Sequence, residues 1–389
     1  MTVKLWMLKK VVLVLLVSVY FLYADFEYTI DNTNFTISQG SIFPEEDETY
    51  VYNYNRLRFR GDYTDENLFA TIIADGVNYL GKQYVGSRSF EYVKLSESDT
   101  PFKTQTRFHD YYEGSVYAKL YRLYGGYEDT DNRVVLGLQN ISMGVGRIWT
   151  PTNLFNPKNT YGLEPDEVFG VAALAYTRHL DETSRVTLVA SQKADHSFKY
   201  AAGYKAFLEF ADMGINLISS NKTKMAGYEI EGDLADTGLE VRSEGAYIKS
   251  RLKGQNGEED KGFFQGILGA DYGFENGLTL VAEVLYSSQT FSYAEIFLNF
   301  DSDIASDLVY SNLYTGLSLS YSFNVFLDAS LLYIESFKDE NSRFISPALT
   351  YILNDYNSFV LGAMILNGES GSEFGAFDNT YYFKYALSF

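Results

Sequence analysis

Three arginines alternate along one short stretch of the chain, NRLRFRGDY. Arg56, Arg58 and Arg60 share one face of an extended strand and Leu57 and Phe59 share the other, because successive side chains of a strand point to opposite sides. A ladder of guanidinium groups is tolerable only beside water or acids, where it can guide anions or the anionic ends of solutes. The alternative is that the arginines pair with Asp or Glu on neighbouring strands and merely fill space.

The histidines give little support for catalysis. The sequence contains three, His109, His179 and His196. His196 is followed directly by Ser197, so the two side chains would lie on opposite faces of a strand rather than form a nucleophile and base pair. The sequence also has no cysteine, no glycine-rich phosphate loop and no clustered histidines. It therefore predicts neither an enzyme, nor a cofactor, nor a metal site.

The elements that position these side chains are expected to be strands. In LYTGLSLSYSF, residues 313–323, a set of Leu, Tyr, Phe and one Thr alternates with a set of Ser, Gly and Tyr. Residues 198–210 alternate in the same way, with Phe, Tyr, Ala and Leu on one face and lysines on the other. The stretch from Asn132 is weaker, because its parity changes near Asn140, which indicates a bulge or an early strand end there.

The links between the strands alternate in length. Short links are expected at 61–67, 125–132, 179–184, 211–214, 234–238, 274–277, 322–324 and 354–357. The links between them are expected at 39–48, 80–110, 149–166, 192–196, 221–223, 252–261, 291–309, 337–342 and 368–376, and most of these are longer or more charged. One strand on each side of every link gives about eighteen, with sixteen as the alternative. Both ends of the chain then lie on the same side.

The N-terminus and the composition indicate export. Residues 1–24 place three lysines before an apolar run that is too short to span a bilayer, as in a cleavable signal peptide. An uncleaved anchor is the alternative. Removing this segment leaves 28 basic and 51 acidic side chains, a balance that argues against a nucleic-acid partner. Without cysteine, the stability of residues 25–389 must come from extensive strand pairing.

The last nine residues, YYFKYALSF, place apolar side chains on one face. Tyr381, Phe383, Tyr385, Leu387 and Phe389 alternate with a more polar set. A strand with such a face can border lipid if the sheet closes into a barrel, because closure pairs every backbone group. A soluble β-sandwich would also alternate, but its charged face would lie outside and its strands would usually be shorter.

With these features the chain resembles a Gram-negative outer-membrane β-barrel of the porin type, whose members end in Phe preceded by alternating aromatic residues. A second likeness lies in GRIWTPTNLFNP, residues 146–157, which is similar to a segment of porin-like families of largely unassigned function. The resemblance implies an all-β fold in which residues 25–389 form one antiparallel up-and-down transmembrane barrel of about eighteen strands. Short periplasmic turns and long extracellular loops would join them.

The resemblance also implies roles for particular residues. The segment 149–166 holds three of the six prolines of the chain and would fold into the lumen and narrow it. Glu164, Asp166 and Glu167 would then lie near the constriction, Arg147 would stand at the start of the loop, and a surface loop packed on the rim is the alternative. Phe383, Tyr385, Leu387 and Phe389 would form the signal that the barrel-assembly machinery reads. Further acids are expected on the inward face, at Glu229, Glu231, Glu240, Glu244, Asp271, Glu283 and Asp328.

The function expected from this resemblance is a diffusion channel for small hydrophilic solutes or ions in the outer membrane. Its other partners would be outer-membrane lipid and lipopolysaccharide. A closed barrel whose surface loops bind a partner or polymer is the second hypothesis. About eighteen strands leave a lumen too wide for side chains alone to fill, which favours the channel. The sequence does not decide the solute, the ion preference or whether copies form a homo-oligomer.

Overall fold

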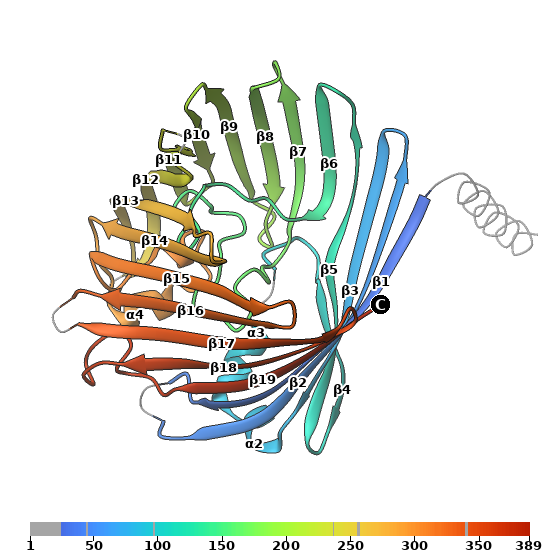
Figure 1. The fold of residues 1–389 in the computed structure, drawn as a ribbon, viewed down its shortest axis with the longest axis vertical. Helices are drawn as coiled ribbons and strands as arrows, with labels where there is room; N and C mark the ends of the chain where they lie inside the picture. The colour runs from blue at the N-terminus through green and yellow to red at the C-terminus, as the bar shows by residue number, and fades with distance from the viewer. Residues whose placement is uncertain (1–24, 44–45, 96–97, 236, 255–256, 339–340) are drawn as a thin grey trace, which may run out of the picture.

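A computed structural model describes residues 25–389 except 44–45, 96–97, 236, 255–256 and 339–340. The expected signal peptide, residues 1–24, lies outside the described residues. The nineteen strands of the described part form one antiparallel sheet that closes on itself (Figure 1). Eighteen of them pair with their neighbours in chain order and make the closed barrel, as the sequence predicts. β4 is the exception, because it pairs with β5 alone.

The strands of the first half are β1 (Asp25–Gly40), β2 (Thr49–Asp65), β3 (Leu68–Leu80), β4 (Gln105–Tyr111), β5 (Gly114–Glu128), β6 (Asn132–Gln139), β7 (Val171–His179), β8 (Ser184–Gln192), β9 (Phe198–Leu208) and β10 (Ala211–Ser219). Those of the second half are β11 (Thr223–Asp233), β12 (Leu239–Gly254), β13 (Gly257–Gly273), β14 (Leu278–Ser287), β15 (Leu313–Asn324), β16 (Leu327–Ser336), β17 (Ser342–Asn354), β18 (Asn357–Asn367) and β19 (Thr380–Ser388). The helical elements are α2 (Lys82–Val85), α3 (Arg88–Leu95), α4 (Tyr293–Leu298) and the 3-10 turn η1 (Ala305–Asp307).

The barrel closes where the two ends of the chain meet. β1 pairs with β19 from Asp31 opposite Ser388 to Gln39 opposite Thr380. Beyond that ladder, the Phe389 N–H donates to the Ile30 carbonyl at 3.0 Å, and the Ile30 N–H donates to the Phe389 carbonyl at 3.2 Å. The terminal residue is therefore the last hydrogen-bonded position of the seam, and residues 25–29 of β1 extend past it, paired with β2.

The two faces of the wall differ as the period-two pattern predicts. On β15, Leu313, Leu317 and Phe323 point outward and are 39%, 42% and 57% exposed, whereas Tyr314 points inward and is 1% exposed. Exposed large apolar side chains recur on the outer face of nearly every strand. The inner face carries charged residues such as Arg242 and Glu244 together with apolar residues such as Ile248 that pack against the loops in the lumen. An apolar surface therefore lies outside, and the buried charges lie within. No helix among the described residues is both long enough and apolar enough to cross a membrane.

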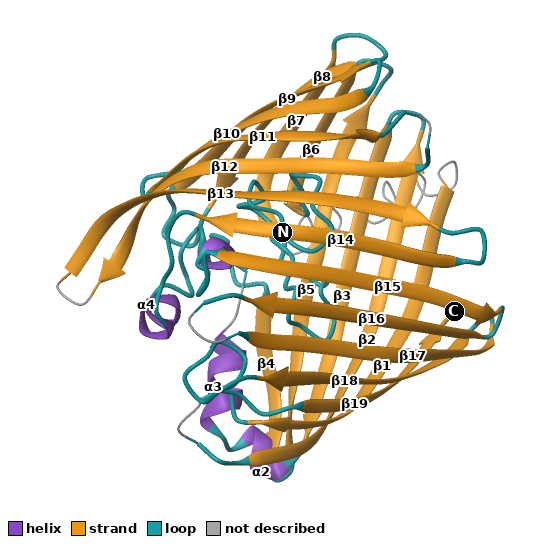
Figure 2. Ribbon diagram, turned by 60° about the vertical axis from the view of Figure 1, so that its left-hand side comes forward, coloured by secondary structure: helices purple, strands orange, loops and turns teal. Residues whose placement is uncertain are grey.

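The barrel has two unlike ends. We call the end with the short connections the turn end and the other the loop end (Figure 2). The eight short links fall close to the expected positions, but two are displaced. The turn expected at 211–214 lies at 209–210, because Gly214 belongs to β10, where a side chain would come within 2.5 Å of the Glu229 Oε1. The turn expected at 322–324 lies at 325–326, where the Asn324 side chain accepts from the Phe326 N–H at 2.8 Å.

At the loop end, the expected link 252–261 is mostly strand, since β12 and β13 stay paired as far as Gly254 and Gly257. The link expected at 80–110 carries α2, α3 and β4. Tyr84 and Phe90 from these helices pack inside the barrel on Tyr52, Tyr79 and Tyr117. The rings of Tyr52 and Tyr84 stack with centroids 3.6 Å apart. The hydrophobic core therefore lies between the wall and the loops that fold into the lumen.

Candidate functional site: a loop held between two walls

The longest described link without regular structure crosses the inside of the barrel. It begins after β6 ends at Gln139 and continues to β7 at Val171, so it spans 140–170 rather than the expected 149–166. Figure 1 shows this segment inside the ring of strands. The early strand end expected near Asn140 is confirmed. We call residues 140–170 the crossing loop.

On one side the crossing loop is fastened to β11, β12 and β14 by buried carboxylates. Glu244 Oε2 accepts from the N–H groups of Val145 and Gly146 at 2.8 and 3.0 Å. Its Oε1 accepts from both the N–H and the hydroxyl of Thr152 at 2.7 Å. Hydrogen bonds to a charged acceptor are stronger than neutral ones, so this one side chain holds two turns of the loop. Glu244 is 0% exposed.

Two further glutamates extend this fastening along the wall. Glu283 on β14 accepts from the N–H of Arg147 at 2.5 Å and from that of Ile148 at 2.9 Å. Glu229 on β11 accepts from the Gly144 N–H at 2.9 Å. Gly144 has a φ of 86°, and a side chain there would overlap the Glu244 carboxylate, so only glycine suits the position. We call Glu229, Glu244 and Glu283 the anchor carboxylates.

Arg147 joins the anchored side through its side chain. Its guanidinium lies 2.9 Å from Glu231, 2.8 Å from Glu240 and 3.2 Å from Asp271. The neighbouring Arg242, whose side chain is fully buried, shares all three acids. Arg147 lies near the start of the crossing loop, and its guanidinium contacts acids of the β11 to β13 wall, away from the arginine ladder.

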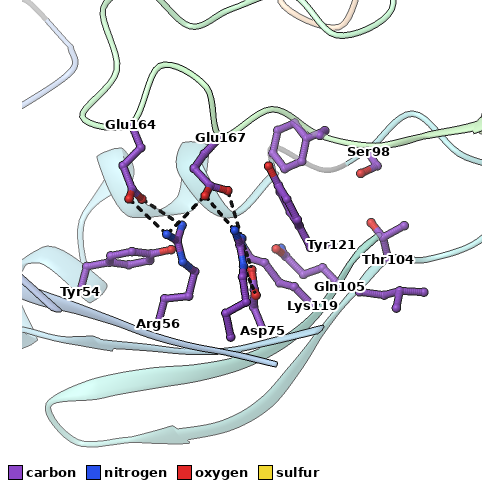
Figure 3. A pocket seen from close by; sticks show the side chains of 13 residues that line it. Tyr54, Arg56, Asp75, Ser98, Thr104, Gln105, Lys119, Tyr121, Glu164 and Glu167 are labelled. Carbon is purple, nitrogen blue, oxygen red and sulfur yellow. Dashed lines mark hydrogen bonds and ion pairs between the residues drawn. The ribbon is translucent and has the colours of Figure 1, made fainter. Parts of the chain in front are cut away.

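At its far end the crossing loop meets the arginines of β2 (Figure 3). Arg56 donates to both carboxylate oxygens of Glu164, at 2.9 and 3.1 Å. Arg58 donates to both oxygens of Glu167, at 2.8 and 3.0 Å, and to both oxygens of Asp75 on β3, at 2.7 and 2.8 Å. Such paired contacts match the fork of the guanidinium group to the carboxylate. We call Arg56, Arg58, Glu164 and Glu167 the ion-pair cluster.

The remaining predicted residues lie outside this cluster. Arg60 pairs with Asp62 on its own strand at 2.5 Å and is half exposed. The Asp166 side chain is 86% exposed and has only a long contact of 3.7 Å with Lys158. It points away because Glu164 and Glu167, three positions apart, turn toward β2 while Asp166 between them faces water. The expected position of Asp166 near a constriction therefore stays a prediction, and its side chain lies outside the ion-pair cluster.

Sequence reasoning missed three members of the site. Asp75 lies directly opposite Arg58 in the β2–β3 register. Lys384 on β19 donates to Glu164 Oε1 at 3.1 Å. Tyr121 on β5 lies under the guanidinium of Arg58, 4.1 Å from its ring centroid. Lys384 carried a signal, because it is the only charged residue in the terminal strand and it lies on the face opposite the aromatic residues.

The electrostatics of Glu167 follow from its place in the cluster. Burial alone would favour its neutral form and raise the pKa, but the Arg58 guanidinium donates to it and Arg56 lies close by. The positive charges prevail, so the pKa of Glu167 lies below its ordinary value. Glu167 therefore stays charged near neutral pH.

Two cavities border the ion-pair cluster, and a third adjoins the first of them. One of about 160 Å³ is lined by Tyr54, Tyr121 and all four members of the cluster. A second, of about 520 Å³, reaches the turn end at residues 354–358 and is lined by the same four side chains. The third, of about 730 Å³, lies among the loops at the loop end and shares Ser98 and Phe169 with the first. The ion-pair cluster thus lies between the 520 Å³ cavity that reaches the turn end and the 160 Å³ cavity that leads toward the loop end.

The described residues contain no group of three or more His, Cys, Asp or Glu that could hold a metal ion. His179 lies at the turn end of the barrel, whereas His109 and His196 lie at the loop end. Asp195 accepts from the hydroxyl and N–H of Ser197, at 2.5 and 2.9 Å. This serine is therefore engaged in a local turn.

No family model matches the sequence. No curated protein matches it either. Its structure is similar to that of OccAB1 from Acinetobacter baumannii, with a TM-score of 0.61 at 11% identity over 94% of this chain and 96% of the other. It is also similar to a BenF-like porin from Pseudomonas fluorescens, with a TM-score of 0.58 at 11% identity over 94% and 99% of the two chains.

The chain has the fold of an outer-membrane porin. A third solved structure agrees, that of Pseudomonas aeruginosa OpdK with vanillate, with a TM-score of 0.55 at 10% identity over 93% and 98% of the two chains. The match therefore covers nearly the whole of each porin. The porin fold and the strand number expected from the sequence are both confirmed.

Proposed function

We propose that the protein is an outer-membrane channel through which small hydrophilic solutes or ions diffuse. The observation that carries this proposal is the ion-pair cluster, which lies where the crossing loop meets β2 and separates cavities that reach toward the two ends of the barrel. The porin fold supports the same conclusion. In this reading Arg56, Arg58, Glu164 and Glu167 form the constriction, and Lys384 and Asp75 complete it.

The constriction presents charges of both signs to a solute. Basic groups come from β2 and β19, and acids come from the crossing loop and β3. A polar solute can exchange its own groups for part of such a pair, whereas an apolar one would leave desolvated charges without partners. The channel should therefore favour polar solutes over apolar ones of the same size.

The second hypothesis, a closed barrel with binding loops, is less well supported. The loops that it would use, residues 80–110 and 291–309, pack in part into the lumen. Tyr84 and Phe90 of the first are 3% and 1% exposed, and Phe291 and Ile304 of the second are 1% and 0% exposed. Phe102 and Phe108 of the first loop and Leu298 and Phe300 of the second stay 43% to 78% exposed, so each loop keeps only part of its apolar surface for a partner.

The C-terminal strand fits a role in assembly. Phe383 is 45% exposed and Phe389 is 68% exposed on the outer face, while Tyr385 and Leu387 alternate with Lys384 and Ala386 in the same strand. Before the barrel closes, this strand would offer both an unpaired edge and an apolar face to the barrel-assembly machinery. Contacts with outer-membrane lipid and lipopolysaccharide follow from the outward apolar surface. No enzyme activity is proposed.

Planar-bilayer conductance with two reciprocal variants tests the proposal. Arg56→Gln/Arg58→Gln leaves three acids at the constriction, so the preference for cations over anions should rise several-fold. Glu164→Gln/Glu167→Gln leaves the arginines in excess, so the preference should move the other way. Arg343→Gln is the matched control, because Arg343 is a half-exposed arginine at the loop end, paired with Glu335 away from the cluster.

Purified, folded protein that carries no current would overturn the channel. If both variants carry current with the ion preference of the original chain, solutes pass elsewhere in the barrel. Either outcome would leave the fold unchanged, since circular dichroism and the heat-dependent gel shift report the folded barrel independently.

A further inference from the structure

Two lysines lie side by side on the outer face of the barrel near the loop end. Lys224 on β11 and Lys249 on β12 are directly opposite each other in the register. Both side chains point outward, because their neighbours Met225 and Ile248 point inward and are 4% and 0% exposed. Like charges directly opposite each other destabilise a strand pair. A bound anion would relieve the repulsion between the two ammonium groups.

The lysine pair lies at the border of the apolar outer surface. The next outward row toward the turn end consists of Leu217, Ala226, Tyr247 and Phe264, which are paired across four successive strands. Leu217 and Tyr247 are 53% and 56% exposed. On β12 the outward positions from Leu239 to Tyr247 cover ~26 Å of strand, which at the usual tilt is ~20 Å of depth. Lys249 follows where an apolar band of ~25 Å ends.

The charge of the pair is poorly matched within the protein. No ion pair among the described residues includes Lys224. The nearest carboxylate to Lys249 is that of Asp260, at 3.8 Å, and this acid lies closer to Arg251, at 3.3 Å. Two other exposed cations near the loop end each have a carboxylate partner. Arg343 lies 3.4 Å from Glu335, and Arg107 pairs with Asp110. A local excess of positive charge therefore stands out in a chain whose net charge is −20.

A hydroxyl group lies beside the same row. Gly262 on β13 is the cross-strand partner of Lys249. A side chain at Gly262 would come within 2.8 Å of the Tyr247 hydroxyl oxygen, so the ring of Tyr247 leans toward the lysine row over the space that glycine leaves. The ammonium groups of Lys224 and Lys249 and the hydroxyl of Tyr247 therefore border the same small area of the outer face. The apolar row of Leu217, Ala226 and Phe264 lies next to it on the side of the turn end.

We propose that Lys224, Lys249 and Tyr247 bind the phosphate group of a lipid headgroup in the outer leaflet. The ammonium groups would pair with the phosphate oxygens, the Tyr247 hydroxyl would donate a third hydrogen bond, and the acyl chains would lie along Leu217, Ala226 and Phe264. This inference depends on the proposed outer-membrane location but not on the passage of solutes. It names a binding site on the outside of the barrel, away from the ion-pair cluster.

Native mass spectrometry of the full-length barrel in neutral detergent, titrated with lipid A, tests the proposal. Each lysine near a lipid phosphate contributes roughly a fivefold gain in affinity, so Lys224→Gln/Lys249→Gln should weaken binding by roughly 25-fold. Lys224→Arg/Lys249→Arg keeps both charges and should bind nearly as well as the original chain. Arg343→Gln, in which a matched outward cation is removed, should change little.

Two further arms identify the source of the phosphate. Lipid A without its phosphates should bind no better to the original chain than to the glutamine variant. Inorganic phosphate at the same concentration should not bind measurably, because it lacks the acyl chains. Equal lipid A binding by the original and glutamine proteins, or equal loss in Arg343→Gln, would overturn the site. Conductance measured on the same preparations is expected to be unchanged, so failure of the channel proposal would be seen separately.

Discussion

The two walls that hold the crossing loop use carboxylates in opposite ways. On the β11 to β14 wall, the acids belong to the strands and bind backbone N–H groups of the loop, as Glu244 and Glu283 do. On the β2 wall, the acids belong to the loop and bind arginine side chains, as Glu164 and Glu167 do. The contacts of Glu244 and Glu283 are fully buried, and that of Glu229 borders a cavity of about 150 Å³, whereas the second kind borders the cavities at the ion-pair cluster. The anchored contacts form a fixed support, whereas the ion-pair cluster lies where we propose that solutes pass.

This difference has a physical basis. A backbone N–H cannot move without the loop, and a buried carboxylate without its donors would be strongly destabilising, so the anchored side has little freedom. A pair of long side chains can open by changes of rotamer while the backbone stays in place, and nearby water weakens it further. The ion-pair cluster is therefore suited to passage, and the anchor carboxylates are suited to holding the loop.

The largest effect is expected from breaking the anchored side. In Glu244→Gln the amide NH2 would face the donors of Thr152 or Val145, so at least one buried hydrogen bond is lost and a donor meets a donor. A cost of ~3–5 kcal/mol is expected for removing one partner of a buried charged network. The midpoint of the heat-dependent gel shift should fall, and single-channel conductance should become larger and noisier as the crossing loop loosens.

Glu240→Gln is the matched control for this variant. It changes a carboxylate on the same strand that is partly exposed and pairs with side chains, those of Arg147 at 2.8 Å and Arg242 at 3.5 Å. A much smaller effect is expected. If Glu240→Gln and Glu244→Gln lower the midpoint equally, the distinction between the two kinds of contact is wrong.

A smaller, pH-dependent effect is expected where a second loop supports the crossing loop. Tyr161 packs on Phe344 and Phe374, with ring centroids 5.3 and 5.5 Å apart, and Glu373 lies next to this group. Burial raises the pKa of Glu373 from its ordinary 4.5 to about 7. Between these values the folded protein keeps a proton that the unfolded chain has lost, so stability falls as the pH rises from 4.5 to about 7 and is constant above it.

Hydrogen exchange of residues 368–379 at pH 5 and pH 8, corrected for the intrinsic rates, measures this effect. Protection should be greater at pH 5 in the original chain and equal at both values in Glu373→Gln. Glu369→Gln changes an exposed acid of the same loop and should keep the pH dependence. Equal protection of the original chain at both pH values would mean that Glu373 ionises normally.

Most of the wall was predictable from local pattern. The alternation in residues 313–323 placed β15 and its faces correctly, because side-chain direction in a strand depends only on position along it. The same rule placed Arg56 and Arg58 on the inner face. Gly214 misled the prediction, since a glycine that makes room for Glu229 looks like a glycine in a turn.

The support of the crossing loop was not predictable from the sequence. Residues 140–148 look like the continuation of a strand, yet their N–H groups bind side chains on strands far along the chain. The contact between Ile148 and Glu283 joins residues 135 positions apart. No local pattern marks such a partner, and the same holds for Lys384 and Glu164, which are 220 positions apart. Long-range contacts of this kind depend on barrel closure.

The central claim is that the end of the crossing loop lies in the path of solutes, and one measurement tests it most directly. The chain has no cysteine, so Glu164→Cys creates a single thiol at the ion-pair cluster. Addition of a charged, membrane-impermeant thiol reagent to this variant in a planar bilayer should change the single-channel current in one discrete step. The same reagent should leave Asp166→Cys, whose side chain faces away from the cluster, nearly unaffected. Complete labelling of the thiol at position 164 without any change of current would contradict the account.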